Sequence, residues 1–166
     1  MKKSKAIFLD RDGVINRNRA DYVKNWQEFV FLPNAKEAIK LLTDKNFKII
    51  IVTNQSAVGR EIITEEQLQE IHRKMVEELE KAGGKIEKIY YCPHAPWDNC
   101  ECRKPKPGML LKASQELGID LKKAFFIGND KKDLEAGKAV GCKTLIVNEK
   151  EDVLAVVKKI LRLTKK

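Results

Sequence analysis

Short apolar runs alternate with longer amphipathic segments along this chain. The runs are KAIFLD (5–10), FKIIIVTN (47–54), KIEKIYYC (85–92), KAFFIGN (123–129) and CKTLIVN (142–148). Each is nearly continuous rather than alternating, which is typical of parallel strands that are covered on both faces. The pattern therefore predicts five buried strands.

Amphipathic segments fill the gaps between these runs. Asn34, followed three residues later by Glu37, predicts a capped helix start, and TEEQ at 64–67 repeats this pattern. Further helices are predicted over 108–117, 131–140 and 151–163. His72 lies off the apolar stripe of its helix and is expected to face solvent. Alternating strands and helices predict a doubly wound, Rossmann-like α/β sheet, whose ligands bind beyond the carboxyl ends of the strands.

Composition limits the classes of protein that fit. With 166 residues and 43% hydrophobic content, the chain is long enough for one domain with a proper core, so we expect a single domain over 1–166. The formal net charge is +9, which favours anionic partners. Apolar runs stay well short of the ~20 residues of a membrane span, and the start does not resemble a signal peptide. We expect a cytoplasmic protein without membrane contact, and a monomer.

Polar side chains gather where the predicted strands end. Asp10 and Asp12 follow the first strand, 53–56 (TNQS) closes the second, and 128–130 (GND) closes the fourth, with Asp133 close behind. A basic stretch at 103–108 could supply a cation. Carboxylates, hydroxyl and amide donors and a lysine are the groups needed for metal-assisted phosphoryl transfer.

These motifs resemble those of the haloacid dehalogenase (HAD) superfamily. The D-x-D-G at 10–13, Thr53 at a strand end, a lysine before the penultimate helix and the acidic turn at 128–133 match its four motifs in order. Within it, FLDRDGVIN, TNQSAVGR, YYCPHAP, CECRKPKPGML and GNDKKD are most similar to the heptose bisphosphate phosphatases, with histidinol-phosphate phosphatases as near relatives. The resemblance implies a HAD fold without the large cap domain.

The resemblance also implies an activity. The family hydrolyses a small phosphosugar with Mg²⁺, and the expected target is the 7-phosphate of D-glycero-D-manno-heptose 1,7-bisphosphate, in lipopolysaccharide or cell-surface sugar synthesis. Asp10 would be the nucleophile that forms an aspartyl phosphate, and Asp12 the general acid and base. Thr53 and Lys104 complete the expected catalytic set. The expected substrate-binding residues are Asn54, Gln55, Arg60 and Arg103.

The fourth motif departs from the family pattern. Asn129 stands where a metal-binding aspartate is usual, and Asp130 follows it. Mg²⁺ would be held by Asp10, the Asp12 carbonyl and either Asn129 or Asp130, and the sequence leaves that choice open. A neutral ligand should weaken Mg²⁺ binding, because hard cations prefer carboxylate oxygen. The alternative to an active phosphatase is a homologue whose catalysis is impaired by the asparagine at this position.

A second cluster of candidate ligands lies between the third strand and the following helix. Cys92, His94, Cys100 and Cys102 have the makeup of a closed Cys₃His zinc site, and the family resemblance agrees. Disulfides are the rival interpretation, but a reducing cytoplasm disfavours them. We expect structural zinc, because four protein ligands leave no position for water.

Two other functions compete with a heptose phosphatase. Histidinol-phosphate phosphatase shares the paired aspartates, the cysteine spacing and RKPK. A zinc-containing nucleic-acid-binding protein or 3′-phosphatase would suit the positive charge. Against nucleic acid binding, the charge is scattered through the helices rather than concentrated beside the cysteines, and a pure binder leaves Asp10, Asp12 and Thr53 unexplained.

Overall fold

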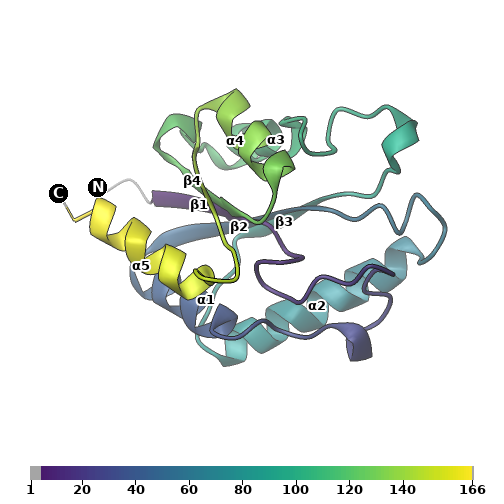
Figure 1. The fold of residues 1–166 in the computed structure, drawn as a ribbon, viewed down its shortest axis with the longest axis horizontal. Helices are drawn as coiled ribbons and strands as arrows, with labels where there is room; N and C mark the ends of the chain where they lie inside the picture. Colours follow the sequence, from purple (N-terminus) through teal and green to yellow (C-terminus); the bar gives the residue numbers. More distant parts are fainter. Residues whose placement is uncertain (1–4, 166) are drawn as a thin grey trace.

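The computed structural model describes residues 5–165 and contains one five-stranded parallel sheet in the order β3-β2-β1-β4-β5. The strands are β1 (Lys5–Leu9), β2 (Phe47–Asn54), β3 (Lys88–Cys92), β4 (Phe125–Gly128) and β5 (Lys143–Ile146). Helices α1 (Ala35–Asp44), α2 (Glu65–Lys81) and α5 (Val153–Leu163) lie on one side of the sheet, and α3 (Gly108–Leu117) and α4 (Lys131–Val140) on the other (Figure 1). The predicted doubly wound α/β fold is confirmed.

Both faces of the sheet are buried, and side chains along each strand alternate between two cores. In β1, Ile7 and Leu9 pack with α1, α2 and α5, whereas Ala6 and Phe8 pack with α3 and α4. Because successive residues of a strand point to opposite faces, a strand covered on both sides must be apolar throughout. This is why the strand sequences read as continuous apolar runs.

The helix starts match the predicted cap at one place and differ at another. The Thr64 hydroxyl accepts a hydrogen bond from the Gln67 N–H (3.1 Å), and the Gln67 side chain accepts one from the Thr64 N–H (2.8 Å), so the capping box of α2 forms. Asn34 has a left-handed backbone (φ 66°) and makes no side-chain cap bond. Its amide instead donates to Asp152 at the start of α5 (2.8 Å), a contact across 118 positions that local sequence cannot reveal.

The prediction that His72 faces solvent is wrong. Its side chain is buried, and its Nε2 lies 3.0 Å from Nη1 of Arg11. The long-range partner explains the burial, since an isolated helix gives no reason to bury an imidazole. Over residues 5–165, none of the helices has both the length and the apolarity to cross a membrane.

Candidate active site

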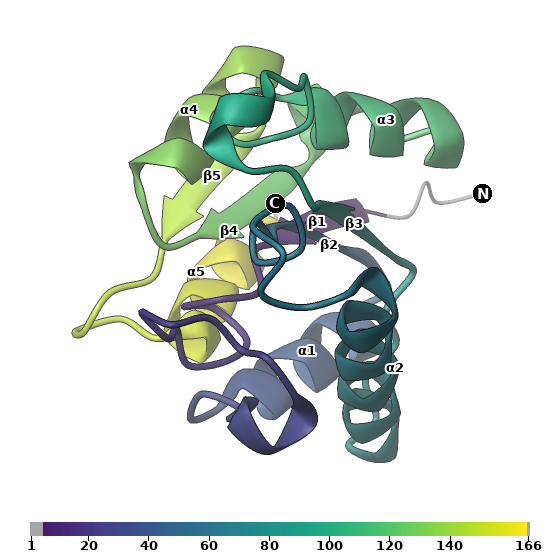
Figure 2. The ribbon, with the colours of Figure 1, turned by 90° about the vertical axis from the view of Figure 1, so that its right-hand side faces the viewer.

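The predicted site residues converge at the carboxyl ends of β1, β2 and β4, where the connecting loops lie on one side of the molecule (right-hand side of Figure 1, facing the viewer in Figure 2). A pocket of about 210 Å³ opens there. Most of the predicted site residues line it: Asp10, Asp12, Asn54, Arg60, Arg103, Lys104, Asn129 and Asp130. Thr53 and Gln55 are buried and do not line it.

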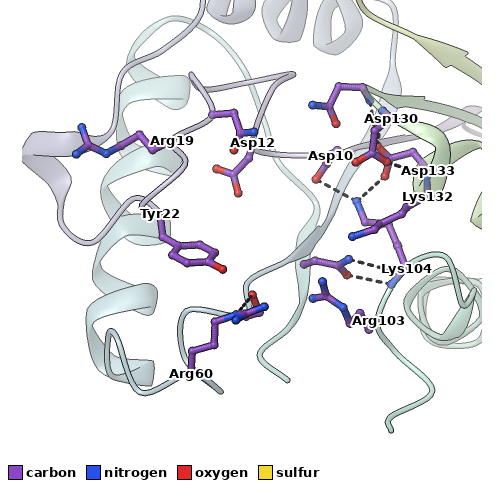
Figure 3. A pocket seen from close by; sticks show the side chains of 14 residues that line it. Asp10, Asp12, Arg19, Tyr22, Arg60, Arg103, Lys104, Asp130, Lys132 and Asp133 are labelled. Atoms are coloured by element: carbon purple, nitrogen blue, oxygen red, sulfur yellow. Dashed lines mark hydrogen bonds and ion pairs between the residues drawn. The ribbon is translucent and has the colours of Figure 1, made fainter. Parts of the chain in front are cut away.

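Lys104 lies between two carboxylates at the base of this pocket. Its Nζ is 3.1 Å from Asp10 Oδ1 and 2.6 Å from Asp133 Oδ1, and it also donates to the Val52 carbonyl (3.2 Å). Figure 3 shows both carboxylates directed at this ammonium group. All three side chains are at most 11% exposed, so solvent screens these charges little. The arrangement places one cation beside the predicted nucleophile.

Burial and neighbouring charges together raise the pKa values of both Asp10 and Lys104. Burial raises the pKa of Asp10 to about 7, and Asp133 and Asp12 add to the rise, while Lys104 opposes it. For Lys104 itself, burial lowers the pKa, but Asp10 and Asp133 outweigh burial and raise it above its ordinary value. Lys104 is therefore a permanent cation, and a further positive charge would favour ionisation of Asp10.

Asp12 has a different environment, although it lies only two residues away. Its Oδ1 accepts hydrogen bonds from Arg11 Nη2 (2.9 Å) and Asn16 Nδ2 (2.8 Å), and its Oδ2 accepts one from Gln55 Nε2 (2.9 Å). Burial tends to raise the pKa of Asp12, but Arg11, Asn16 and Gln55 together lower it. The surroundings thus shift the pKa values of these two neighbouring aspartates in opposite directions, upward for Asp10 and downward for Asp12.

Two expected phosphate ligands also position other groups. Thr53 Oγ1 accepts from Gln55 Nε2 (2.9 Å), so Thr53 orients the side chain that bonds Asp12. The Asn54 amide bonds the main chain of Lys104 in both directions, through Oδ1 (3.0 Å) and Nδ2 (3.1 Å). Asn54 thus fixes the segment that carries the lysine, and its contact with phosphate stays a prediction.

The two candidate residues of the fourth motif occupy different positions. Asp130 is exposed, and its carboxylate caps α4 by accepting from the Lys132 and Asp133 N–H groups. One end of the Asn129 amide lies 3.2 Å from Asp10 Oδ2 and 3.3 Å from Asp133 Oδ2. With nitrogen at that end, the amide donates to both carboxylates. With oxygen there, three oxygens face one another, which a divalent cation would stabilise, so these residues fit Mg²⁺.

Basic and aromatic side chains form the outer part of the pocket. The Arg60 guanidinium lies 4.9 Å from the Trp97 ring centroid and 5.9 Å from that of Tyr22. Arg103 has a buried Nη1 that finds no hydrogen-bond partner within residues 5–165. A buried, unpaired donor beside a pocket is costly, and an anionic ligand would satisfy it. Arg60 and Arg103 lie on the pocket side away from Arg19 and Asp12 (Figure 3).

Three of the four predicted zinc ligands come together. Among the described residues, the sulfurs of Cys92, Cys100 and Cys102 lie within 4.8 Å of one another, and all are free thiols. Cys92 Sγ lies 3.5 Å from Cys100 Sγ and 2.8 Å from Cys102 Sγ. Zn–S bonds of ~2.3 Å in a tetrahedron separate sulfurs by roughly 3.8 Å, so the three thiols match a zinc site in chemistry, and the Cys92–Cys102 pair is closer than a bound ion would hold it. The imidazole of His94 lies outside this group, and its role as the fourth ligand stays a prediction.

The cysteine loop is attached to the loop that carries Arg60. The Gln55 N–H donates to the Cys92 carbonyl (2.8 Å), and the Gly59 N–H donates to the Pro93 carbonyl (2.7 Å). A Cβ at Gly59 would lie 2.7 Å from that carbonyl oxygen, so the close approach requires glycine. The cysteine cluster therefore supports Arg60 as well as the adjoining Arg103 and Lys104.

Sequence reasoning missed two buried polar residues around the site. Arg11 and His72 lie behind Asp12. Asp133, which the sequence places in the acidic turn at 128–133, bonds Lys104. Arg11 had no signal in the sequence, since an arginine in a loop is ordinarily solvated.

Sequence comparisons identify relatives over most of the chain. A family model described as "Polynucleotide kinase 3 phosphatase" matches residues 5–156. The D-glycero-beta-D-manno-heptose-1,7-bisphosphate 7-phosphatase of Pseudomonas aeruginosa is 40% identical over 141 residues, which cover 85% of this chain and 79% of that protein. The D-glycero-alpha-D-manno-heptose-1,7-bisphosphate 7-phosphatase of Campylobacter jejuni is 43% identical over 150 residues, covering 90% and 86%.

Solved structures agree with these relatives. The fold matches a D,D-heptose 1,7-bisphosphate phosphatase from B. bronchiseptica, complexed with magnesium and phosphate, at a TM-score of 0.91 and 33% identity, over 96% of this chain and 99% of that one. A putative HAD-like phosphatase from Mesorhizobium loti matches at a TM-score of 0.79 and 26% identity, covering 95% and 87%. The chain thus belongs to the HAD-superfamily phosphatases, in the family of the heptose-1,7-bisphosphate 7-phosphatases.

Proposed function

We propose that this protein is a Mg²⁺-dependent phosphatase that removes the 7-phosphate of D-glycero-D-manno-heptose 1,7-bisphosphate. The observation that carries the proposal is the contact of Asp10 with Lys104 (3.1 Å) at the base of a pocket whose rim holds further cations. A buried carboxylate beside a fixed ammonium is suited to attack a phosphoryl group, because the cation offsets charge on both reactants. The named relatives support the substrate.

The reaction divides into two displacements at phosphorus. An oxygen of ionised Asp10 attacks the phosphorus and the bond to the sugar oxygen breaks. Asp12, which must enter this step protonated, gives its proton to that oxygen. In the second step Asp12 takes a proton from water, whose oxygen attacks the aspartyl phosphate, so that phosphate leaves and Asp10 is restored. Lys104 neutralises charge on the transferring group and Asn54 binds its oxygens. Thr53 orients the Gln55 side chain that bonds Asp12.

We propose one metal in the pocket and another at the cysteine cluster. Asp10, the Asp12 carbonyl and Asn129, with Asp133 alongside, would hold Mg²⁺, and Asp130 is the less suitable candidate because its carboxylate caps α4. Mg²⁺ supplies neutralisation of charge between carboxylate and phosphate. Cys92, His94, Cys100 and Cys102 would hold structural zinc. Such thiols stay reduced in the cytoplasm, where we expect the enzyme to act.

Arg60 and Arg103 are suited to bind the second phosphate of a bisphosphate substrate. Arg60 and Arg103 lie across the pocket from Asp12, and we assign them to the parts of the substrate beyond the reacting phosphate. The unpaired donor of Arg103 supports this role, because a second phosphate would accept from it. Both the alpha and the beta anomer are candidate substrates, since relatives of both names match at similar identity.

A phosphate-release screen tests the proposal. The panel contains both anomers of heptose 1,7-bisphosphate, heptose 7-phosphate, histidinol phosphate and a 3′-phosphorylated oligonucleotide, the last because of the description of the matched family model. We expect the highest kcat/KM for one heptose bisphosphate anomer. A higher kcat/KM for histidinol phosphate or the oligonucleotide would show that the proposed substrate is wrong. If no ester released phosphate in the presence of Mg²⁺, phosphatase activity itself would be rejected.

A further inference from the structure

A fully buried arginine lies directly behind the two aspartates of the site. Arg11 is 0% exposed, although it stands between Asp10 and Asp12 in the sequence. Its Nε and Nη2 both donate to Asp12 Oδ1, at 3.2 and 2.9 Å, and Nη1 lies 3.0 Å from His72 Nε2. A buried guanidinium has lost its hydration, so these hydrogen bonds replace its contacts with water and fix its position.

The contact with His72 has only one chemically allowed direction. Arginine has five N–H donors and no acceptor, so Nε2 of His72 must accept the hydrogen bond and the ring proton must be on Nδ1. Burial, and then the charge of Arg11, lower the pKa of His72 to about 3, which agrees with a neutral ring. His72 therefore acts as a fixed acceptor that holds one end of the guanidinium, 61 positions away along the chain.

The other end of the guanidinium holds the Asp12 carboxylate in one orientation. Oδ1 accepts from Arg11 twice and from Asn16 Nδ2 at 2.8 Å, so its lone pairs are fully used. Oδ2 accepts only from Gln55 Nε2 (2.9 Å) and keeps one lone pair. In Figure 3 the Asp12 carboxylate faces the open centre of the pocket. The free position for a transferable proton is thus on Oδ2.

We propose that Arg11 and His72 are positioning residues that hold Asp12 so that Oδ2 alone exchanges protons with the leaving oxygen of the substrate. The proposal rests on the proposed function, because it needs Asp12 as the proton-transfer group. His72 touches Arg11 from α2 and does not line the pocket with the aspartates, so it acts through Arg11. Without the His72 contact, the guanidinium and the carboxylate that it holds are free to rotate.

Misplacing Asp12 should matter only where the leaving group needs a proton. A sugar alkoxide is a strong base, and its departure requires protonation as the phosphorus–oxygen bond breaks. The p-nitrophenolate ion is a much weaker base and leaves without a proton. Since kcat/KM reports steps up to the first irreversible one, comparing the two substrates isolates the first displacement, before Asp12 activates water in the second.

The experiment measures kcat/KM of the full chain with Mg²⁺ for heptose 1,7-bisphosphate and for p-nitrophenyl phosphate. General acid catalysis contributes roughly 10²- to 10⁴-fold, so His72→Leu should lose about 10- to 100-fold with the sugar phosphate and less than about threefold with p-nitrophenyl phosphate. His72→Gln, which places an amide oxygen within reach of Arg11, should recover most of the loss. Arg11→Lys should show the same selective loss, because an ammonium group cannot make all three contacts.

Two controls separate positioning from stability. Leu79→Ala removes a buried side chain near the far end of α2, so it should lower the melting temperature without changing the ratio of the two kcat/KM values. If His72→Leu does not fold, His72→Asn makes the same comparison, since its shorter amide cannot reach Arg11. Equal losses with both substrates, or none with either, overturn the positioning role. A parent enzyme that hydrolyses neither ester rejects the proposed function instead.

Discussion

The raised pKa of Asp10 predicts that the proposed nucleophile destabilises the protein when magnesium is absent. The carboxyl has an ordinary pKa of 3.8 and a folded pKa of about 7, because of burial and then the nearby Asp133 and Asp12 carboxylates. Below 3.8 it is protonated in both the folded and the unfolded state, and above about 7 it is ionised in both. Between these values the folded state binds more protons, so the free energy of unfolding falls as pH rises.

The size of this effect follows from the two pKa values. The interval from 3.8 to about 7, at ~1.36 kcal/mol for each pH unit, corresponds to roughly 4 kcal/mol. Roughly 2 to 3 kcal/mol of it develops between about pH 5 and about pH 8. Asp10→Asn replaces the carboxyl by a neutral group of similar shape. The variant should therefore be more stable than the parent at about pH 8. The difference in free energy of unfolding between variant and parent should be roughly 2 to 3 kcal/mol smaller at about pH 5.

Urea unfolding followed by circular dichroism, in buffer without magnesium, measures both proteins at the two pH values. Asp12→Asn is the matched control, because the folded pKa of Asp12 is lowered and its stabilising effect is complete above its ordinary pKa of 3.8. That variant leaves Arg11 without its carboxylate and should lose about 3 to 5 kcal/mol at both pH values. The difference between the two pH values should be much smaller than for Asp10→Asn, because Asp12 makes only a minor contribution to the raised pKa of Asp10. A difference between Asp10→Asn and the parent that stays constant with pH would refute the reasoning.

Two further predictions concern the metals. The purified protein should contain about one zinc ion per chain by elemental analysis, and Cys100→Ser should lower both zinc content and melting temperature; stoichiometric disulfides without metal would contradict this. In magnesium titrations of activity, Asn129→Asp should reduce the concentration needed for half-maximal rate, because it adds a carboxylate beside Asp10 and Asp133, whereas Asp130→Ala should leave that concentration nearly unchanged. The opposite ranking would make Asp130 the ligand.

Strands and most helices could be predicted because they depend on local patterns. Strands buried on both faces must be apolar throughout, and the cap formed by Thr64 and Gln67 involves neighbours only three positions apart. Helices α3 and α4 begin and end at the predicted residues for the same reason. The hydrogen-bond partner of the Asn34 side chain could not be predicted. The side chain could cap its own helix or bond Asp152, and only the tertiary structure brings Asp152 within reach.

The site was predictable where residues follow strand ends and unpredictable where they meet across the chain. Asp10, Asp12 and Lys104 belong to ordered motifs, and the parallel sheet brings their strand ends together. The burial of Arg11 depends on His72 in α2, and neither residue has a neighbour in sequence that indicates the pairing. The buried Arg11 guanidinium next to the Asp12 carboxylate is visible only once the distances are known.

Trapping the covalent intermediate tests the central claim, that Asp10 is the nucleophile of a phosphatase. Enzyme quenched with acid during turnover of heptose 1,7-bisphosphate is reduced with borohydride, which converts an aspartyl phosphate to homoserine, and the peptide that contains residues 5–17 is sequenced by mass spectrometry. We expect homoserine at position 10 in the parent, dependent on substrate, and unmodified peptide in Asp10→Asn. Homoserine at another aspartate, or rapid phosphate release by Asp10→Asn, would contradict the account.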